Sequence, residues 1–197
     1  GAIHRFIQSD NFKNFKPSNI ISLAWPSGLI ASSLDIVCLP RDHSVAQARN
    51  AGAALAKLRG KECILLALDG VRRADEIAFG LAMRDYRFID HKTDAVLNDG
   101  AVTVMCTNPK IVEAAYAPLL AVIEGTFLTR DLVNEPANVL TTNNFANRLE
   151  EMSALGLKVE VLDEKELEQL GMRTLLCVGQ GSESPSKVVI MKWDGGQ

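Results

Sequence analysis

The chain has 197 residues, of which 47% are hydrophobic and 23% are charged, so it suits one or two folded domains and not a disordered chain. A net charge of −3 excludes a global attraction to nucleic acid or to an anionic membrane. We find no apolar run near the roughly 20 residues of a membrane span and no signal-peptide core, so we expect a cytoplasmic protein without a membrane partner.

Charge is nevertheless uneven along the chain. Residues 1–100 hold 13 Lys and Arg against 11 Asp and Glu, whereas residues 101–197 hold 8 against 13. The slight excess of positive charge in the first half is too small to predict a nucleic-acid surface.

The first hundred residues alternate apolar runs with helical patterns. Strands are predicted at residues 19–25, 34–40, 62–68 and 100–106, and helices at 43–60 and 74–84. Residues 62–68 (ECILLAL) form a continuous apolar run, which is typical of a strand buried on both faces. Gly60 is the expected end of the first helix, and Gly52 inside that helix costs it some stability. This order predicts an α/β layer domain, a sheet with helices on its faces, over residues 1–110.

A long helix is predicted at residues 111–134, with Pro118 tolerated in a first turn or at a kink. It ends near Asn134 because Pro136 excludes helical geometry from Glu135. Such a helix is typical of a rigid connection between two domains.

A second α/β pattern begins at residue 135. Thr142 is the expected N-cap of a helix that Gly156 ends, and Asp163 with Glu166 resembles a capping box for a helix that Gly171 ends. Strands are predicted at residues 158–163, 174–182 and 187–193. Residues 135–197 are too few for a complete parallel sheet with its crossovers, so we expect only the start of a second domain.

Cysteine and histidine give no sign of a metal site. Cys38, Cys63, Cys106 and Cys177 lie in or at the end of apolar runs and are expected to be buried free thiols in strands. The three histidines, His4, His43 and His91, are far apart in sequence. No HExxH motif occurs, so zinc held by His or Cys is not expected.

Other candidate motifs have simpler interpretations. VGQGSES (178–184) lacks the third glycine of a dinucleotide fingerprint and is interpreted as a tight turn between strands. Ser182 and Ser184 lie in that turn with no base identifiable nearby. The acidic clusters and the basic set are interpreted as solvated surfaces; they comprise Glu150, Glu151 and residues 163–168, and Arg72, Arg73, Arg84, Arg87 and Lys92.

Three segments resemble the leucyl aminopeptidase, or cytosol aminopeptidase, family. They are TRDLVNEPANVLTTNNFA (129–146), the start of the helix in VLDEKELEQLGM (161–172), and LLCVGQGSESP (175–185), in the family's order and spacing. IAFGLAMRDYRF (77–88) resembles an upstream helix of the same family. The sequence departs from the pattern at Ala137 and Thr142, where the family often has proline.

The resemblance implies a subunit more than twice this length, with an α/β domain joined by a long helix to a peptidase domain. It implies a homo-hexamer and two divalent metal ions (zinc, manganese or magnesium) that act on the N-terminal residue of a peptide. The family's metal-binding motifs are absent from these 197 residues, so no catalytic, cofactor-binding or metal residue is assigned. Residues Arg130, Asp131, Asn134, Glu135 and Pro136 match the family and are interpreted as architectural.

Three hypotheses follow from the resemblance. In the first, the chain is the N-terminal part of a metal-dependent aminopeptidase and is inactive alone, because peptide substrates would bind the missing domain. In the second, residues 1–100 bind nucleic acid, a role known for some members of the family. In the third, the chain is a non-catalytic structural subunit.

Overall fold

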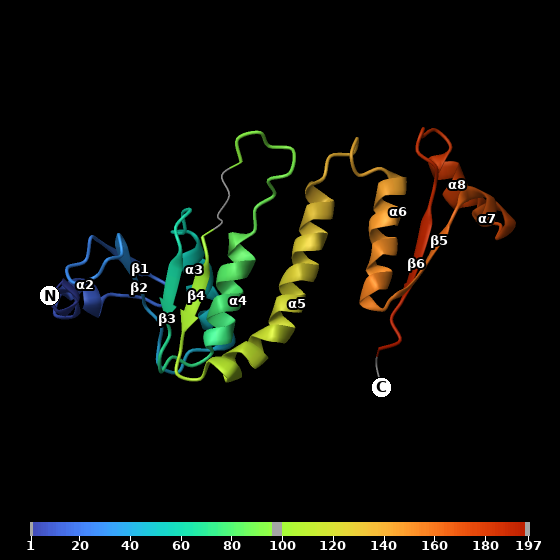
Figure 1. The fold of residues 1–197 in the computed structure, drawn as a ribbon. Helices are drawn as coiled ribbons and strands as arrows, with labels where there is room; N and C mark the ends of the chain where they lie inside the picture. Colours follow the sequence, from blue (N-terminus) through green and yellow to red (C-terminus); the bar gives the residue numbers. More distant parts are fainter. Residues whose placement is uncertain (1, 96–99, 196–197) are drawn as a thin grey trace. The chain divides into compact units, whose positions relative to one another are not determined.

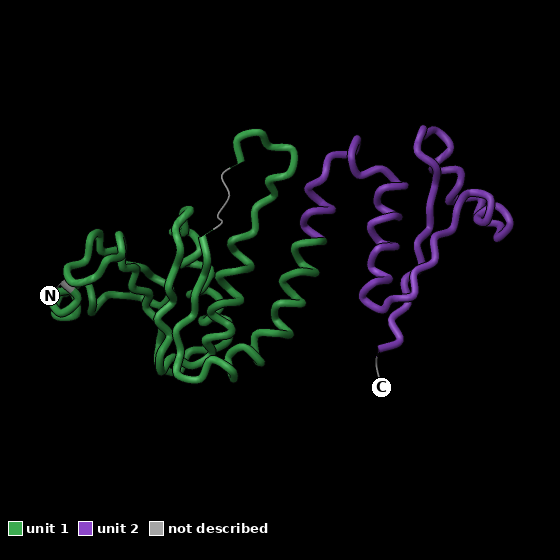
Figure 2. The backbone as a smooth tube through the Cα atoms, in the orientation of Figure 1, with its two compact units in different colours: residues 1–128 green, residues 129–197 purple. Residues whose placement is uncertain are grey.

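The computed structural model describes residues 2–95 and 100–195 (Figure 1). Gly1, residues 96–99 and residues 196–197 lie outside this description. The chain forms two compact units, residues 1–128 and 129–197 (Figure 2). The predicted α/β class is confirmed, because helices alternate with small sheets in both units.

Two short helices begin the first unit, α1 (Ala2–Ile7) and α2 (Asp10–Lys13). The Ser9 hydroxyl caps α2 by accepting the backbone N–H of Phe12. The Phe6 ring packs edge-on against Phe12 and Phe15, with ring centroids 5.5 and 5.4 Å apart. These aromatic contacts hold the two helices close to the chain that leads into the first strand.

The two strands predicted next form an antiparallel hairpin. Strand β1 (Ile20–Ala24) pairs with β2 (Ser33–Val37), and Ile20 lies opposite Val37. The connecting residues turn through positive φ at Trp25 (49°) and Gly28 (88°). Apolar side chains are left in solvent at this tip, where Trp25 is 79% exposed.

A strand–helix–strand unit follows helix α3 (Val45–Ala56). Strand β3 (Ile64–Ala67), helix α4 (Ala74–Asp85) and strand β4 (Val102–Met105) succeed one another, and β3 pairs parallel with β4. Helix α3 ends at Ala56 and not at Gly60, because a tightened turn follows in which the N–H groups of Lys57 and Leu58 bond to carbonyls three residues earlier.

The core of this unit lies between the β3–β4 pair and the two helices. Its buried members are small or aliphatic: Ala48, Ala56, Leu66, Leu68, Ala74, Ile77 and Leu81. Helices α3 and α4 approach so closely that a Cβ at Gly52 would overlap the backbone of Ile77, and one at Gly80 the backbone of Arg49. Arg49 also pairs with Glu76 across the two helices at 2.6 Å.

A buried ion pair closes the far end of α4. Arg59 pairs with Asp85, and its guanidinium also donates to the Gly100 carbonyl. The two charged side chains are only 8% and 14% exposed, so each offsets the charge of the other where water is largely excluded.

Two expectations about burial are wrong. In β3 only alternate residues are covered, and Leu65 is 62% exposed, so this strand has one face in the core and one in solvent. The thiols are not uniformly buried in strands either: Cys63 and Cys177 are exposed, and Cys177 lies in a helix.

Helix α5 (Pro109–Asn134) runs from the first unit into the second. In Figure 1 it bends along its length, and Pro118 lies inside it, where it removes one backbone N–H from the helical ladder. By length and composition it is apolar enough to cross a membrane, a property that core helices of soluble proteins share. The sequence expectation concerned uninterrupted apolar runs, and Glu113 and Glu124 interrupt this helix, so the helix does not contradict that expectation.

The second unit continues with α6 (Thr142–Glu150), the 3-10 helix η1 (Glu151–Leu155) and strand β5 (Lys158–Leu162). Helices α7 (Glu164–Gln169) and α8 (Arg173–Gly179) and strand β6 (Val188–Lys192) complete it. Strands β5 and β6 pair antiparallel, with Lys158 opposite Lys192. The Asp163–Glu166 capping box of α7 and the left-handed Gly156 after η1 are confirmed.

Two predictions are wrong in this unit. Residues 174–182, predicted to be a strand, belong mostly to α8, so VGQGSES is the end of a helix and the turn before β6, and not a turn between strands. The N-cap of α6 is Thr141 and not Thr142.

Candidate functional site

The segment from the end of α5 to the start of α6 carries the most distinctive residues of the sequence. Helix α5 ends at Asn134, although the Glu135 N–H still donates to the Asp131 carbonyl at 3.0 Å. The Pro136 carbonyl then accepts the N–H groups of Val139 and Leu140, both at 2.9 Å. Proline therefore ends one helix, and its carbonyl anchors the next turn.

Side-chain oxygens and amides fix the start of α6. The Thr141 hydroxyl accepts the Asn144 N–H at 3.3 Å, and the Asn144 side-chain amide donates to the Val139 carbonyl at 2.6 Å. Backbone groups that neither helix could satisfy thus find partners within the connection. The connection between the two helices is therefore held by its own hydrogen bonds.

A carboxylate is buried in this segment. The Glu135 side chain is 3% exposed, and its Oε1 accepts a hydrogen bond from Nη2 of Arg148 on α6 at 2.7 Å. A buried carboxylate is tolerated when an opposite charge and hydrogen bonds replace the water it loses. The ion pair holds the end of α5 against α6 inside the second unit.

The turn after α8 has a structural explanation. The Ser184 N–H donates to the Ser182 hydroxyl at 3.1 Å, and the Ser186 N–H donates to the Glu164 carboxylate at the start of α7 at 2.8 Å. Neither contact activates a nucleophile. These serines order the chain between α8 and β6.

The charged clusters are at the surface, where the sequence places them. Glu150, Glu151 and the acidic residues of α7 are exposed, as is the whole basic set. One member of that set, Arg72, pairs with Asp42 at 3.4 Å. The basic residues come from the loop before α4, from its last turn and from the chain after it.

His43 is the buried histidine of the described chain. It is 5% exposed, and its two ring nitrogens lie 2.8 Å from the carbonyl oxygens of Pro40 and Arg72. The ring joins the loop after β2 to the loop before α4, which is a structural role. Sequence reasoning missed this contact because it joins residues 29 positions apart.

The described residues do not fit a metal centre. Within residues 2–95 and 100–195, no group of three or more His, Cys, Asp or Glu side chains lies close enough together to hold a metal ion.

Comparison with known proteins identifies the segment. A family model described as cytosol aminopeptidase family, catalytic domain, matches residues 127–197. Proteins described as probable cytosol aminopeptidases from Cereibacter sphaeroides and Dinoroseobacter shibae are 48% and 49% identical to the chain over 196 residues. Both alignments cover 100% of this chain, which spans 40% of the length of either relative.

Solved structures agree with the fold. The bottromycin maturation enzyme BotP in complex with Mn matches 98% of this chain and 42% of its own, with a TM-score of 0.76 at 29% identity. A mutant of tomato leucine aminopeptidase has the same fold over 96% of this chain and 41% of its own, with a TM-score of 0.77 at 18% identity. The chain thus belongs to the cytosol aminopeptidase family, with an N-terminal α/β unit followed by residues that match the family's catalytic domain.

Proposed function

We propose that this chain is the N-terminal part of a two-metal-dependent leucyl aminopeptidase that releases N-terminal residues from peptides in the cytosol. One observation carries the proposal: residues 127–197 match the family's catalytic domain, while the chain spans 40% of the length of its relatives. The Mn complex of BotP supports a divalent metal in the parent protein.

In this proposal the described residues organise the protein and do not perform chemistry. Helix α5 connects the two units, and the Glu135–Arg148 pair fixes the first helix of the catalytic domain against the end of α5. The metal ions, the peptide and the other subunits of a homo-hexamer would bind residues outside this chain.

The test is a hydrolysis assay of the 197-residue chain with leucine p-nitroanilide and Mn²⁺, with the Cereibacter sphaeroides relative as the positive control. We expect the relative to release p-nitroaniline and the chain alone to release none above buffer. Metal-dependent turnover by the chain alone would show that it holds a catalytic centre and would contradict the proposal.

A longer version of the protein separates loss of activity from misfolding. The gene would be read beyond the codon for Gln197, and the protein expressed to the length of the relatives. The extended protein is expected to hydrolyse the substrate and to assemble as a hexamer in sedimentation analysis. An inactive but folded extended protein would instead favour a non-catalytic structural subunit.

A further inference from the structure

Strand β1 has one hydrogen-bonded edge and one free edge. The Trp25 N–H donates to the Ser32 carbonyl at 2.8 Å, and the Cys38 N–H donates to the Asn19 carbonyl at 2.9 Å. In an antiparallel pair the residues that face the partner alternate along the strand. With this register, the odd-numbered residues 19–25 direct their backbone groups toward β2.

The even-numbered residues of β1 direct their backbone groups the other way. They are Ile20, Ser22 and Ala24, and β2 is the one strand paired with β1 among the described residues, so no second strand meets their N–H groups. Edge strands are commonly protected against further pairing by lysine, proline or a bulge. The sequence of β1, IISLA, carries no lysine or proline, so its free edge is open to another strand.

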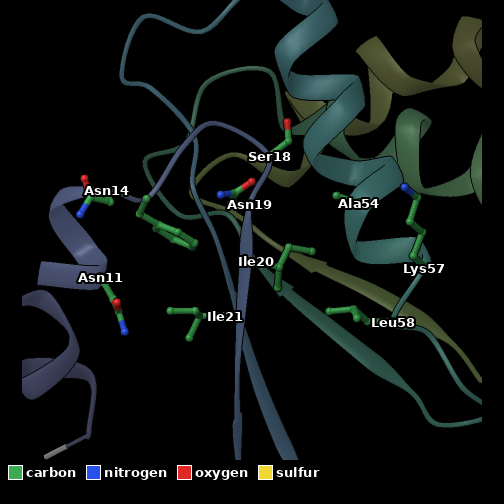
Figure 3. A pocket seen from close by; sticks show the side chains of 10 residues that line it. Asn11, Asn14, Ser18, Asn19, Ile20, Ile21, Ala54, Lys57 and Leu58 are labelled. Atoms are coloured by element: carbon green, nitrogen blue, oxygen red, sulfur yellow. The ribbon is translucent and has the colours of Figure 1, made fainter. Parts of the chain in front are cut away.

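A groove of about 560 Å³ lies at the start of β1, where Ile20 and Ile21 are part of its lining. Figure 3 shows Ile20 and Ile21 pointing to opposite sides of β1, Ile20 toward Leu58 after α3 and Ile21 toward Asn11 of α2. Because Ile20 and Ile21 both line it, the groove reaches both faces of the strand at its first two residues and adjoins the free edge at Ile20.

The polar and charged side chains that line the groove indicate which ligand it would bind. Side-chain amides and hydroxyls can meet a peptide backbone, and Asn11, Asn19 and Ser18 supply them here. Lys57 is the charged residue of the lining, and no ion pair to it occurs among the described residues. An extended peptide with a carboxylate near Lys57 is therefore favoured over a basic one.

The geometry points to a peptide-docking site: we propose that the free edge of β1 accepts an extended acidic peptide as an additional strand. The N–H and C=O groups of Ile20, Ser22 and Ala24 form the ladder, and the Lys57 ammonium meets the carboxylate. Recognition by strand addition takes its affinity from the backbone and its specificity from neighbouring side chains. This site lies in the first unit and does not depend on the proposed peptidase activity.

The probes are two labelled six-residue peptides of alternating threonine and valine, one ending in aspartate and one in amidated lysine. With the full chain, we expect the acidic peptide to bind about fivefold more tightly, as a surface ion pair allows. Its binding should shift the amide resonances of Ile20, Ser22 and Ala24 and slow their exchange with solvent. The absence of these shifts with either peptide would overturn the proposal.

Two variants test the assigned roles. Lys57→Glu should reverse the preference between the two peptides, whereas Lys165→Glu, on the second unit, should leave it unchanged. Ser22→Pro removes one outward N–H without touching the ladder to β2 and should weaken both peptides. Circular dichroism checks that Ser22→Pro is folded. If this variant does not fold, the peptide preference of Lys57→Glu tests the proposal by itself.

Self-association is the competing outcome. A second copy of the chain could pair through the same edge, although this would bring two Lys57 side chains to one ribbon. Dimerisation that rises with concentration and disappears in Lys57→Glu or Ser22→Pro would assign the edge to a second copy and overturn the peptide assignment. An unchanged peptide preference in Lys57→Glu would equally overturn it.

Discussion

The ion pairs that single charged side chains form in this chain depend more on how the helices pack than on the residues next to them in the sequence. Glu135 and Arg148 are 13 positions apart, yet the structure makes them an ion pair with a buried carboxylate. Arg59 and Asp85 form a second such pair at the end of α4. The sequence places Glu135 correctly at a helix end but does not reveal its partner, because charge pairing over such distances depends on how the helices pack.

Tyr116 on α5 gives a pH-dependent prediction at this scale. Burial raises the pKa of its phenol above the ordinary value of 10.0, because desolvation disfavours the phenolate. The folded state therefore keeps its proton at pH values where the unfolded chain loses it. The contribution of protonated Tyr116 to the stability of the folded state is fully present below about pH 10. It is lost as the pH rises through the folded-state pKa.

Urea unfolding of the wild-type chain and of Tyr116→Phe at pH 8 and pH 11 measures this effect. We expect the free energy of unfolding of the wild type to fall more than that of the variant between the two pH values. Comparing the two proteins cancels the contributions of the ionisable groups that they share. An equal fall in both would contradict the role assigned to Tyr116.

At the scale of helices and strands, local signals locate most elements, and packing determines the rest. The capping box at Asp163 and Glu166 is readable because its partners are three residues apart. The prediction for residues 174–179 (TLLCVG) is wrong because a short apolar run does not distinguish a strand from a helix. Likewise, ECILLAL does not show which face of β3 is covered, and Leu65 lies on the uncovered one.

Gly52 illustrates a packing requirement hidden from the sequence. Its substitution by alanine adds helix propensity of about 1 kcal/mol, but the new Cβ overlaps the Ile77 backbone on α4. We expect Gly52→Ala to destabilise the chain by about 1–3 kcal/mol, the usual cost of overpacking. Gly125→Ala on α5 is the matched control, because its Cβ meets no atom within 4 Å.

Both variants are measured by urea unfolding at neutral pH. We expect Gly52→Ala to lower the free energy of unfolding, and Gly125→Ala to leave it unchanged or to raise it slightly. If Gly52→Ala were as stable as Gly125→Ala, the close approach of α3 and α4 would not limit the packing of the first unit.

For the whole molecule, buried side chains are unevenly distributed between the two units. Most of the buried apolar residues belong to the first unit, whereas Ala146, Leu162 and Leu167 are those of the second. Helix α8 has no buried residue, and Val178 on it is 87% exposed. The alternation of strands and helices predicts the α/β class, but sequence alone does not predict this difference in burial.

Amide hydrogen exchange measured by mass spectrometry tests the consequence for local stability. Peptides from α3, β3 and α4 should exchange about tenfold or more slowly relative to peptides from α8, because few apolar contacts oppose local opening of α8. Each measured exchange rate is divided by the intrinsic rate calculated for the same peptide sequence, so that only the effect of structure is compared. Equal protection in α4 and α8 would show that exposed surface does not govern local stability in this chain.

The two exposed cysteines fall one in each unit, Cys63 in the first and Cys177 in the second. With Cys38 and Cys106 replaced by serine, a donor dye and an acceptor dye can be attached to Cys63 and Cys177. The efficiency of energy transfer between them then reports the distance between two points on either side of α5. Energy transfer between single dye pairs would then show whether the long helix holds the units at one separation or at several. Repeating the measurement in a full-length relative with equivalent labels would show how the rest of such a protein changes that separation.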